Sequence, residues 1–206
     1  MSEHPVTEII HKVLKNDARK ALDAAANAQF ELTPLRIVGT GTGTTISVTT
    51  NGTPSGAPDA EFSNTQAKLV ADEMAERDIP TFDGTHYMAI ARPTTLRAFK
   101  DDLEAIHQYV SEGWHVIMNG EKGRYEGIRY CEQTNIAAEG WTNSDAIFFF
   151  GSDTVVEAFA IQEEIRGKIP TDYGRSKGVA WYALLGYGLV HTAAAQARIL
   201  KWDSTE

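Results

Sequence analysis

Two glycine-rich stretches have the composition of loops that bind phosphate groups. In residues 119–134 (NGEKGRYEGIRYCEQT), glycines 120, 123 and 127 flank Lys122 and Arg124. The other stretch has glycines at 39, 41 and 43. A phosphate loop needs a helix directly after its glycines, because the free N–H groups of the first helical turn bind the anion. The residues that follow each stretch therefore test this chemistry.

Strands, not helices, are predicted after both stretches. β-Branched residues follow the glycines at 39–43, and the sequence alternates in polarity after Gly127. Both patterns favour strands, and neither stretch contains Gly-Lys-Ser/Thr. We predict a flexible hairpin and loop after residue 39, with a hairpin turn at Asn51-Gly52, and a glycine turn that leads into a strand at 128–134. A nucleotide-binding α/β enzyme that uses these loops stays the alternative, and a helix after either loop would favour it.

The other reactive residue types lack a spacing that marks catalysis. No two histidines are four residues apart, and His-Glu-x-x-His does not occur; the histidines are His4, His11, His86, His107, His115 and His191. The single cysteine, Cys131, excludes an intramolecular disulfide and a Cys-rich metal site, and we interpret it as a small buried apolar side chain. We interpret Glu121, Glu126 and Glu132 as solvated. We predict no catalytic, cofactor-binding or metal-binding residue, and no cofactor.

The overall composition is that of a globular protein with an acidic surface. The 206 residues are 42% hydrophobic and carry a formal net charge of −9. This charge argues against general binding to nucleic acid phosphates. The N-terminus lacks the pattern of a secretory signal, and the longest apolar stretch, around 179–190, is too short and too rich in glycine to span a membrane.

The elements that must position these residues alternate between helix and strand. Apolar residues between Val6 and Ala28 recur every three or four positions, which predicts a long helix with one buried face. Ser63 and Gln66 form a capping-box pattern at the start of a helix over 63–79. We predict further helices at 94–99 and 101–110, and strands at 35–38, 86–92, 128–134, 146–150 and 161–169. Residues 114–118 are predicted to form a short strand or a buried turn. In 178–202 the alanines are typical of a helix, whereas the spaced glycines and the aromatic residues favour two strands. This mixture indicates an α+β fold.

Several of these segments resemble one family, in the same order. NGEKGRYEGIRYCEQT resembles the Gly-Glu-x-Gly…Gly-Ile/Val-Arg-Phe/Tyr region of tailed-bacteriophage major capsid proteins, in particular the branch of short-tailed phages. HYMAIARPTTLRAFKDD resembles the strand, proline and helix upstream of that region, and AIFFFGSDTVVEAF resembles the apolar strand that follows it. The helix at 63–79 occupies the place of the preceding helix. The likeness covers residues 60–160.

The resemblance implies a tailed-phage major capsid fold with three parts. Residues 1–35 would form the spine helix of a peripheral domain, residues 36–160 would form most of a compact axial domain, and residues 161–206 would return as strands of the peripheral domain. Family members carry an N-terminal arm and an extended loop before the spine helix, and this sequence starts at the helix. We therefore expect a fragment or a minimal version of the family.

The function that the resemblance implies is structural, not enzymatic. Copies of the chain would assemble into pentamers and hexamers of an icosahedral capsid that encloses double-stranded DNA without sequence-specific contact. The expected location is the virion, after assembly in the host cytoplasm, and further partners would be portal, scaffold or decoration proteins. No membrane partner is expected. An encapsulin-like compartment shell is a second alternative, because it shares the fold.

Overall fold

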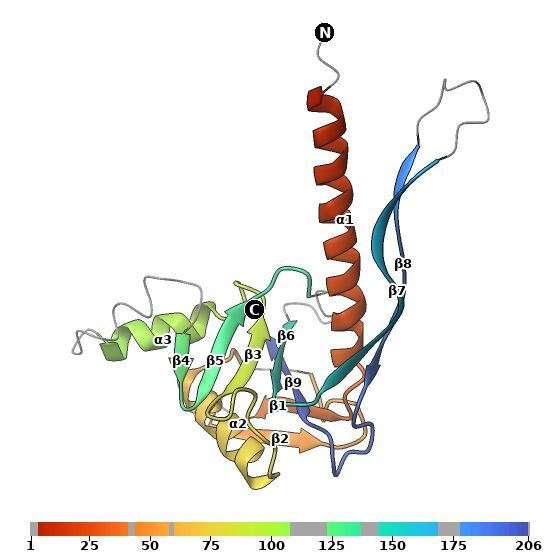
Figure 1. The fold of residues 1–206 in the computed structure, drawn as a ribbon. Helices are drawn as coiled ribbons and strands as arrows, with labels where there is room; N and C mark the ends of the chain where they lie inside the picture. The colour runs from red at the N-terminus through yellow and green to blue at the C-terminus, as the bar shows by residue number, and fades with distance from the viewer. Residues whose placement is uncertain are drawn as a thin grey trace.

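The computed structural model describes residues 4–40, 44–57, 60–107, 123–136, 144–168 and 178–205. Their centre is a seven-stranded mixed sheet (Figure 1) with the order β2-β1-β9-β6-β3-β5-β4. The strands are β1 (Leu35–Thr40), β2 (Thr45–Thr49), β3 (Tyr87–Ala91), β4 (Gly123–Tyr125), β5 (Ile128–Glu132), β6 (Ser144–Phe150) and β9 (Ile199–Thr205). β1 pairs with β9 and β3 pairs with β5 in parallel, and the other neighbours are antiparallel.

Two helices cover one face of this sheet, namely α2 (Asn64–Glu76) and α3 (Arg97–His107). Phe62 is fully buried at the centre of this layer, where its ring packs against Phe99 and Trp202 at centroid distances of 5.4 Å each. The backbone N–H of Ser63 donates to Oε1 of Gln66 over 2.7 Å, as the capping-box pattern predicts. We call the sheet with α2 and α3 the body.

The remaining helix and two strands form a projection that we call the arm. It consists of α1 (His4–Phe30) and a two-stranded antiparallel hairpin of β7 (Val155–Gly167) and β8 (Val179–Leu189). Figure 1 shows α1 and the hairpin rising side by side from one end of the sheet. The register of the hairpin shifts between Phe159 and Ile161 and again before Glu164.

Polar contacts join the arm to the body at the base of α1. The Thr33 hydroxyl donates to the carbonyl oxygen of Ile199 over 2.5 Å, and Lys201 Nζ, buried in β9, pairs with the carboxylate of Glu31. Asn135 Nδ2 donates to Asp23 Oδ2 over 3.1 Å. The base of α1 is therefore anchored to the body.

Most predicted elements are confirmed, and three predictions need correction. The two helices predicted at 94–99 and 101–110 form one helix, α3. It begins at Arg97, because Pro93, Thr94 and Thr95 lie in a turn before it. Asn51-Gly52 is not a hairpin turn: it follows β2, which pairs with β1 alone, and the Gly52 N–H donates to the Pro34 carbonyl. The third correction concerns the single buried face expected for α1, because most apolar residues of this helix whose burial is described are exposed.

The short strand or buried turn predicted at 114–118 lies outside the described residues. The division into parts at residues 35 and 160 stays a prediction. β7 crosses residue 160, and β9 lies in the large sheet between β1 and β6.

Candidate assembly surface

A strand follows each glycine stretch that was a candidate phosphate loop. The glycines at 39–43 lead from β1 into β2, with residues 41–43 outside the described part. Gly127 and Glu126 have φ angles of 71° and 48° and form the turn between β4 and β5. A two-residue turn with φ > 0 at both positions matches the twist of a hairpin. A nucleotide-binding enzyme would require a helix directly after one of these glycine stretches. In the described chain, a strand follows each of them.

Gly39 has a packing role. A Cβ added there would lie 2.9 Å from Gln66 Nε2 and 3.2 Å from two ring carbons of Trp202. The absence of a side chain lets β1 approach α2 and β9 closely, and a phosphate is not needed to explain this glycine.

The structure scatters the other candidate residues. Cys131 is half-buried in β5 and not fully buried as predicted, and Glu132 at the end of β5 pairs with Lys100. Glu126 is exposed in its turn. In the described ranges, no three side chains of His, Cys, Asp or Glu are grouped so that they could hold a metal ion. Glu121 and His115 lie outside these ranges.

One carboxylate has an unusual electrostatic environment, and its role is to order a turn. Asp83 Oδ1 accepts the backbone N–H groups of His86 and Thr85 over 2.7 and 3.0 Å, and Oδ2 accepts Arg129 Nη1 over 3.1 Å. These hydrogen bonds, those from the two backbone N–H groups above all, hold the pKa of Asp83 far below its ordinary value of 3.8. Asp83 thereby ties the loop before β3 to β5.

Most of the arm is exposed to solvent, unlike the buried core of the body. Ala18 is the single buried residue among those residues of α1 whose burial is described, and Ile9, Ile10 and Val13 are exposed. The prediction of a single buried face on α1 is therefore wrong. The apolar residues lie on two sides of the helix, and the hairpin covers one of these two sides. No helix in the described chain is both long and apolar enough to cross a membrane.

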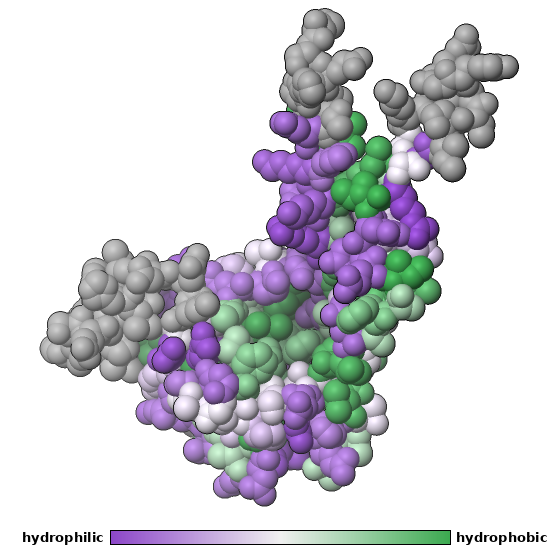
Figure 2. Space-filling view, in the orientation of Figure 1, coloured by the Kyte–Doolittle hydropathy of each residue, from purple (hydrophilic) through white to green (hydrophobic). Residues whose placement is uncertain are grey.

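The hairpin is equally open. Every residue of β7 is exposed except Val155 and Ile161, which are half-buried, and exposed apolar side chains include Val156, Phe159 and Ile165. β7 and β8 pair with one another and with no other described strand, so the outer edges keep unpaired backbone groups. Figure 2 shows hydrophobic side chains gathered along the hairpin and between it and α1. A two-stranded hairpin is at best marginally stable in water, and exposed strand edges invite pairing.

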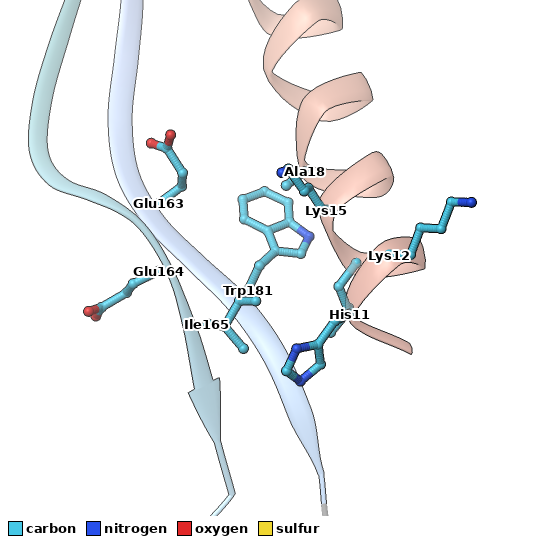
Figure 3. A pocket seen from close by; sticks show the side chains of 9 residues that line it. His11, Lys12, Lys15, Ala18, Glu163, Glu164, Ile165 and Trp181 are labelled. Atoms are coloured by element: carbon cyan, nitrogen blue, oxygen red, sulfur yellow. The ribbon is translucent and has the colours of Figure 1, made fainter. Parts of the chain in front are cut away.

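A groove of about 480 Å³ separates α1 from the hairpin. Its walls are mainly apolar, and Figure 3 shows Trp181 of β8 lying between the two elements. The Trp181 Nε1–H donates to Asp17 Oδ2 over 2.9 Å and so holds the hairpin to the helix. Basic side chains of α1 (Lys12 and Lys15) line one rim, and Glu163 and Glu164 of β7 line the other.

These features make the arm the candidate surface for association with protein. Its exposed apolar side chains alternate with charges of both signs, and its strand edges carry free donors and acceptors. Sequence analysis identified the elements of the arm but missed the exposure. The signal that could have found it is the number of apolar positions on α1, which is larger than one buried face can hold.

The comparison with known proteins places the fold. No protein-family model matches the sequence, and no curated protein is similar to it. The structure is similar to a chain of the capsid of the cyanophage P-SCSP1u, with a TM-score of 0.53 at 10% sequence identity, over 100% of this chain and 66% of that one. At such low identity the likeness concerns the fold alone. The mixed α/β architecture is therefore that of a capsid-type fold.

Two further structures are similar in part. The capsid asymmetric unit of cyanophage Pam1 gives a TM-score of 0.46 at 15% identity, covering 58% of this chain and 38% of that one. The holo-SrpI encapsulin complex from Synechococcus elongatus PCC 7942 gives 0.40 at 15% identity, covering 75% and 52%. This chain thus spans 38% to 66% of the length of the three proteins. The short-tailed branch of the family stays a prediction.

Proposed function

We propose that this chain is a structural subunit of a viral capsid, which assembles with copies of itself through the arm. The observation that carries the proposal is the extent of uncovered surface. In the arm, Val13, Phe159 and Leu184 are each more than half exposed. Apolar surface that gathers uncovered on one part of a molecule marks a site of association with protein.

The physical requirements of a shell fit this arrangement. Each subunit makes the same contacts with its neighbours. The binding free energy of each contact can be small, because a closed shell contains many copies of it. Contacts between different patches of the same chain form closed rings where the rotation allows, and pentamers and hexamers are such rings. The body supplies a stable unit with its own core, and the arm supplies surface for neighbours. The capsid-type fold supports these separate roles of the body and the arm.

Double-stranded DNA is the proposed content, and the function is not catalytic. The formal charge of −9 disfavours tight adhesion to the packaged phosphates. Assembly would take place in the host cytoplasm and the product would be the virion capsid, with portal, scaffold or decoration proteins as further partners. A subunit of the short-tailed phage branch is the form that the sequence resemblance favours.

Electron microscopy and mass photometry of the purified chain test the proposal. We expect rings, tubes or closed particles at concentrations in the micromolar range. A chain that stays monomeric at all concentrations and salt conditions would contradict it. Recovery of nuclease-protected DNA from particles made in cells is expected of a capsid, and particles that hold a protein cargo and no DNA would instead indicate a compartment shell.

A further inference from the structure

α1 carries a second, mainly apolar line of residues that stays exposed and that the hairpin touches at Asp17, whose carboxylate accepts the Trp181 N–H. Six positions separated by three or four residues lie along one side of the helix. All six are exposed; they are Ile10, Val13, Asp17, Ala21, Ala24 and Ala28. The neighbouring line, which includes Leu14, Ala18 and Leu22, is buried or half-buried against the hairpin. We call the six exposed positions the exposed seam.

The side chains of the exposed seam change in size along the helix. Its N-terminal half carries large side chains, with Ile10 43% and Val13 60% exposed, and its C-terminal half carries alanines alone. A second identical helix laid parallel would place the large residues against each other and leave a gap between the alanines. An antiparallel helix would place large side chains over small ones along the whole seam, and such alternation gives close packing.

The charges near the centre of the seam favour the same direction. Asp17 and Lys20 lie at equal distances from a midpoint between residues 18 and 19, and so do Val13 and Ala24. In an antiparallel pair about this midpoint, Asp17 of each copy faces Lys20 of the other. In a parallel pair like charges would face one another, which is unfavourable. Asp17 keeps one carboxylate oxygen for this contact, because Oδ2 accepts the Trp181 N–H.

We propose that α1 binds the α1 of a second copy in antiparallel orientation, through the exposed seam and about a two-fold axis beside residues 18 and 19. The inference rests on the proposed function in that the partner is a copy of this chain. Figure 1 shows the N-terminal part of α1 projecting past the sheet with the hairpin on one side, and all six seam positions are exposed. At about 1.5 Å per residue, the seam from Ile10 to Ala28 gives a contact line of roughly 27 Å.

Disulfide trapping in the full chain tests the orientation. In a Cys131→Ser background, a mixture of Val13→Cys and Ala24→Cys proteins is expected to form crosslinked dimers, whereas each variant alone is not. Glu8→Cys mixed with Arg19→Cys is the matched control, because these exposed positions are also eleven residues apart but lie on the other side of the helix. Crosslinking of Val13→Cys with itself at the rate of the mixture, or of the mixture at the rate of the control, would overturn the proposal.

Charge exchange tests the central contact. Lys20→Asp and Asp17→Lys each replace two ion pairs by two repulsions, so each should raise the dimer dissociation constant about tenfold in sedimentation velocity at low salt. The double exchange should restore it to within about threefold of Trp181→Phe, the control that lacks the same hydrogen bond to Asp17. A double variant no tighter than Lys20→Asp alone would overturn the proposal. Particles that assemble without the Val13–Ala24 crosslink would overturn this inference and leave the proposed function standing, whereas absence of all association would refute both.

Discussion

The body and the arm use apolar residues in opposite ways. In the body, Phe62 and Trp202 are completely buried between the sheet and its two helices. In the arm, Val13 and Phe159 are each 60% exposed although both elements are well formed. The body therefore completes its own core, whereas much of the apolar surface of the arm stays exposed. The difference teaches that regular secondary structure and a complete core are separate properties of this chain.

The largest effect should follow from a cavity in the body. Phe62→Ala removes a ring that packs on Phe99, Tyr130, Phe149 and Trp202. We expect the free energy of unfolding to fall by about 4 kcal/mol, because the site cannot collapse around the lost volume. Urea denaturation followed by tryptophan fluorescence measures it. A loss below about 1 kcal/mol would mean that the body does not depend on this core.

A buried ion pair in the body should come next. Arg36 Nη2 lies 2.6 Å from Asp203 Oδ1, and the Asp203 side chain is fully buried. Arg36→Met leaves a buried carboxylate without its main cation, which costs about 3 kcal/mol of unfolding free energy. Denaturation at neutral pH measures this loss, and Arg166→Met is the control, because the ion pair of Arg166 with Glu164 is exposed in the arm. Equal effects of the two variants would contradict the comparison.

In the arm, removal of apolar groups should leave the isolated chain nearly unchanged. The triple variant Val156→Ser, Phe159→Ser and Leu184→Ser affects side chains that are each more than half exposed. We expect a change of at most about 0.5 kcal/mol in unfolding free energy, because little burial is lost, together with loss of particles in electron microscopy. Normal assembly of this variant would show that this part of the arm does not bind neighbours.

The smallest effect is expected from the carboxylate that orders the turn before β3. The pKa of Asp83 is lowered in the folded chain, so the carboxylate contributes stability above its ordinary value of 3.8 and loses it as the pH falls through the folded pKa. Asp83→Asn should therefore melt at a slightly lower temperature than the unaltered chain near neutral pH, and this difference in melting temperature should narrow steadily as the pH falls below 3.8. Calorimetry across this range measures it, and a gap that widens at acid pH would refute the assignment.

Local signals in the sequence predicted much of the fold. The capping-box residues Ser63 and Gln66 predicted the start of α2, because a side chain that satisfies free backbone groups acts within one turn. The apolar run at 146–150 predicted β6, which is central and buried on both faces. β-Branched residues and alternating polarity also predicted a strand after each glycine stretch, and β2 and β5 confirm this prediction.

Long-range features were beyond these signals. Arg36 and Asp203 are 167 positions apart in the chain, and no local pattern pairs them. The place of β9 between β1 and β6 follows from packing of the whole sheet. The exposed surface of the arm could not be predicted from the sequence either. A hydrophobic stripe indicates that a helix face favours burial, but it does not identify what covers that face.

The sequence by itself determined where helices and strands form, since propensity, caps and periodicity act over a few residues. The tertiary structure alone decided which line of α1 lies against β8 and which stays open. Both lines have helical spacing and apolar character, so local energetics do not separate them. Only the position of the hairpin, tied to the helix by Trp181 and Asp17, covers one and exposes the other.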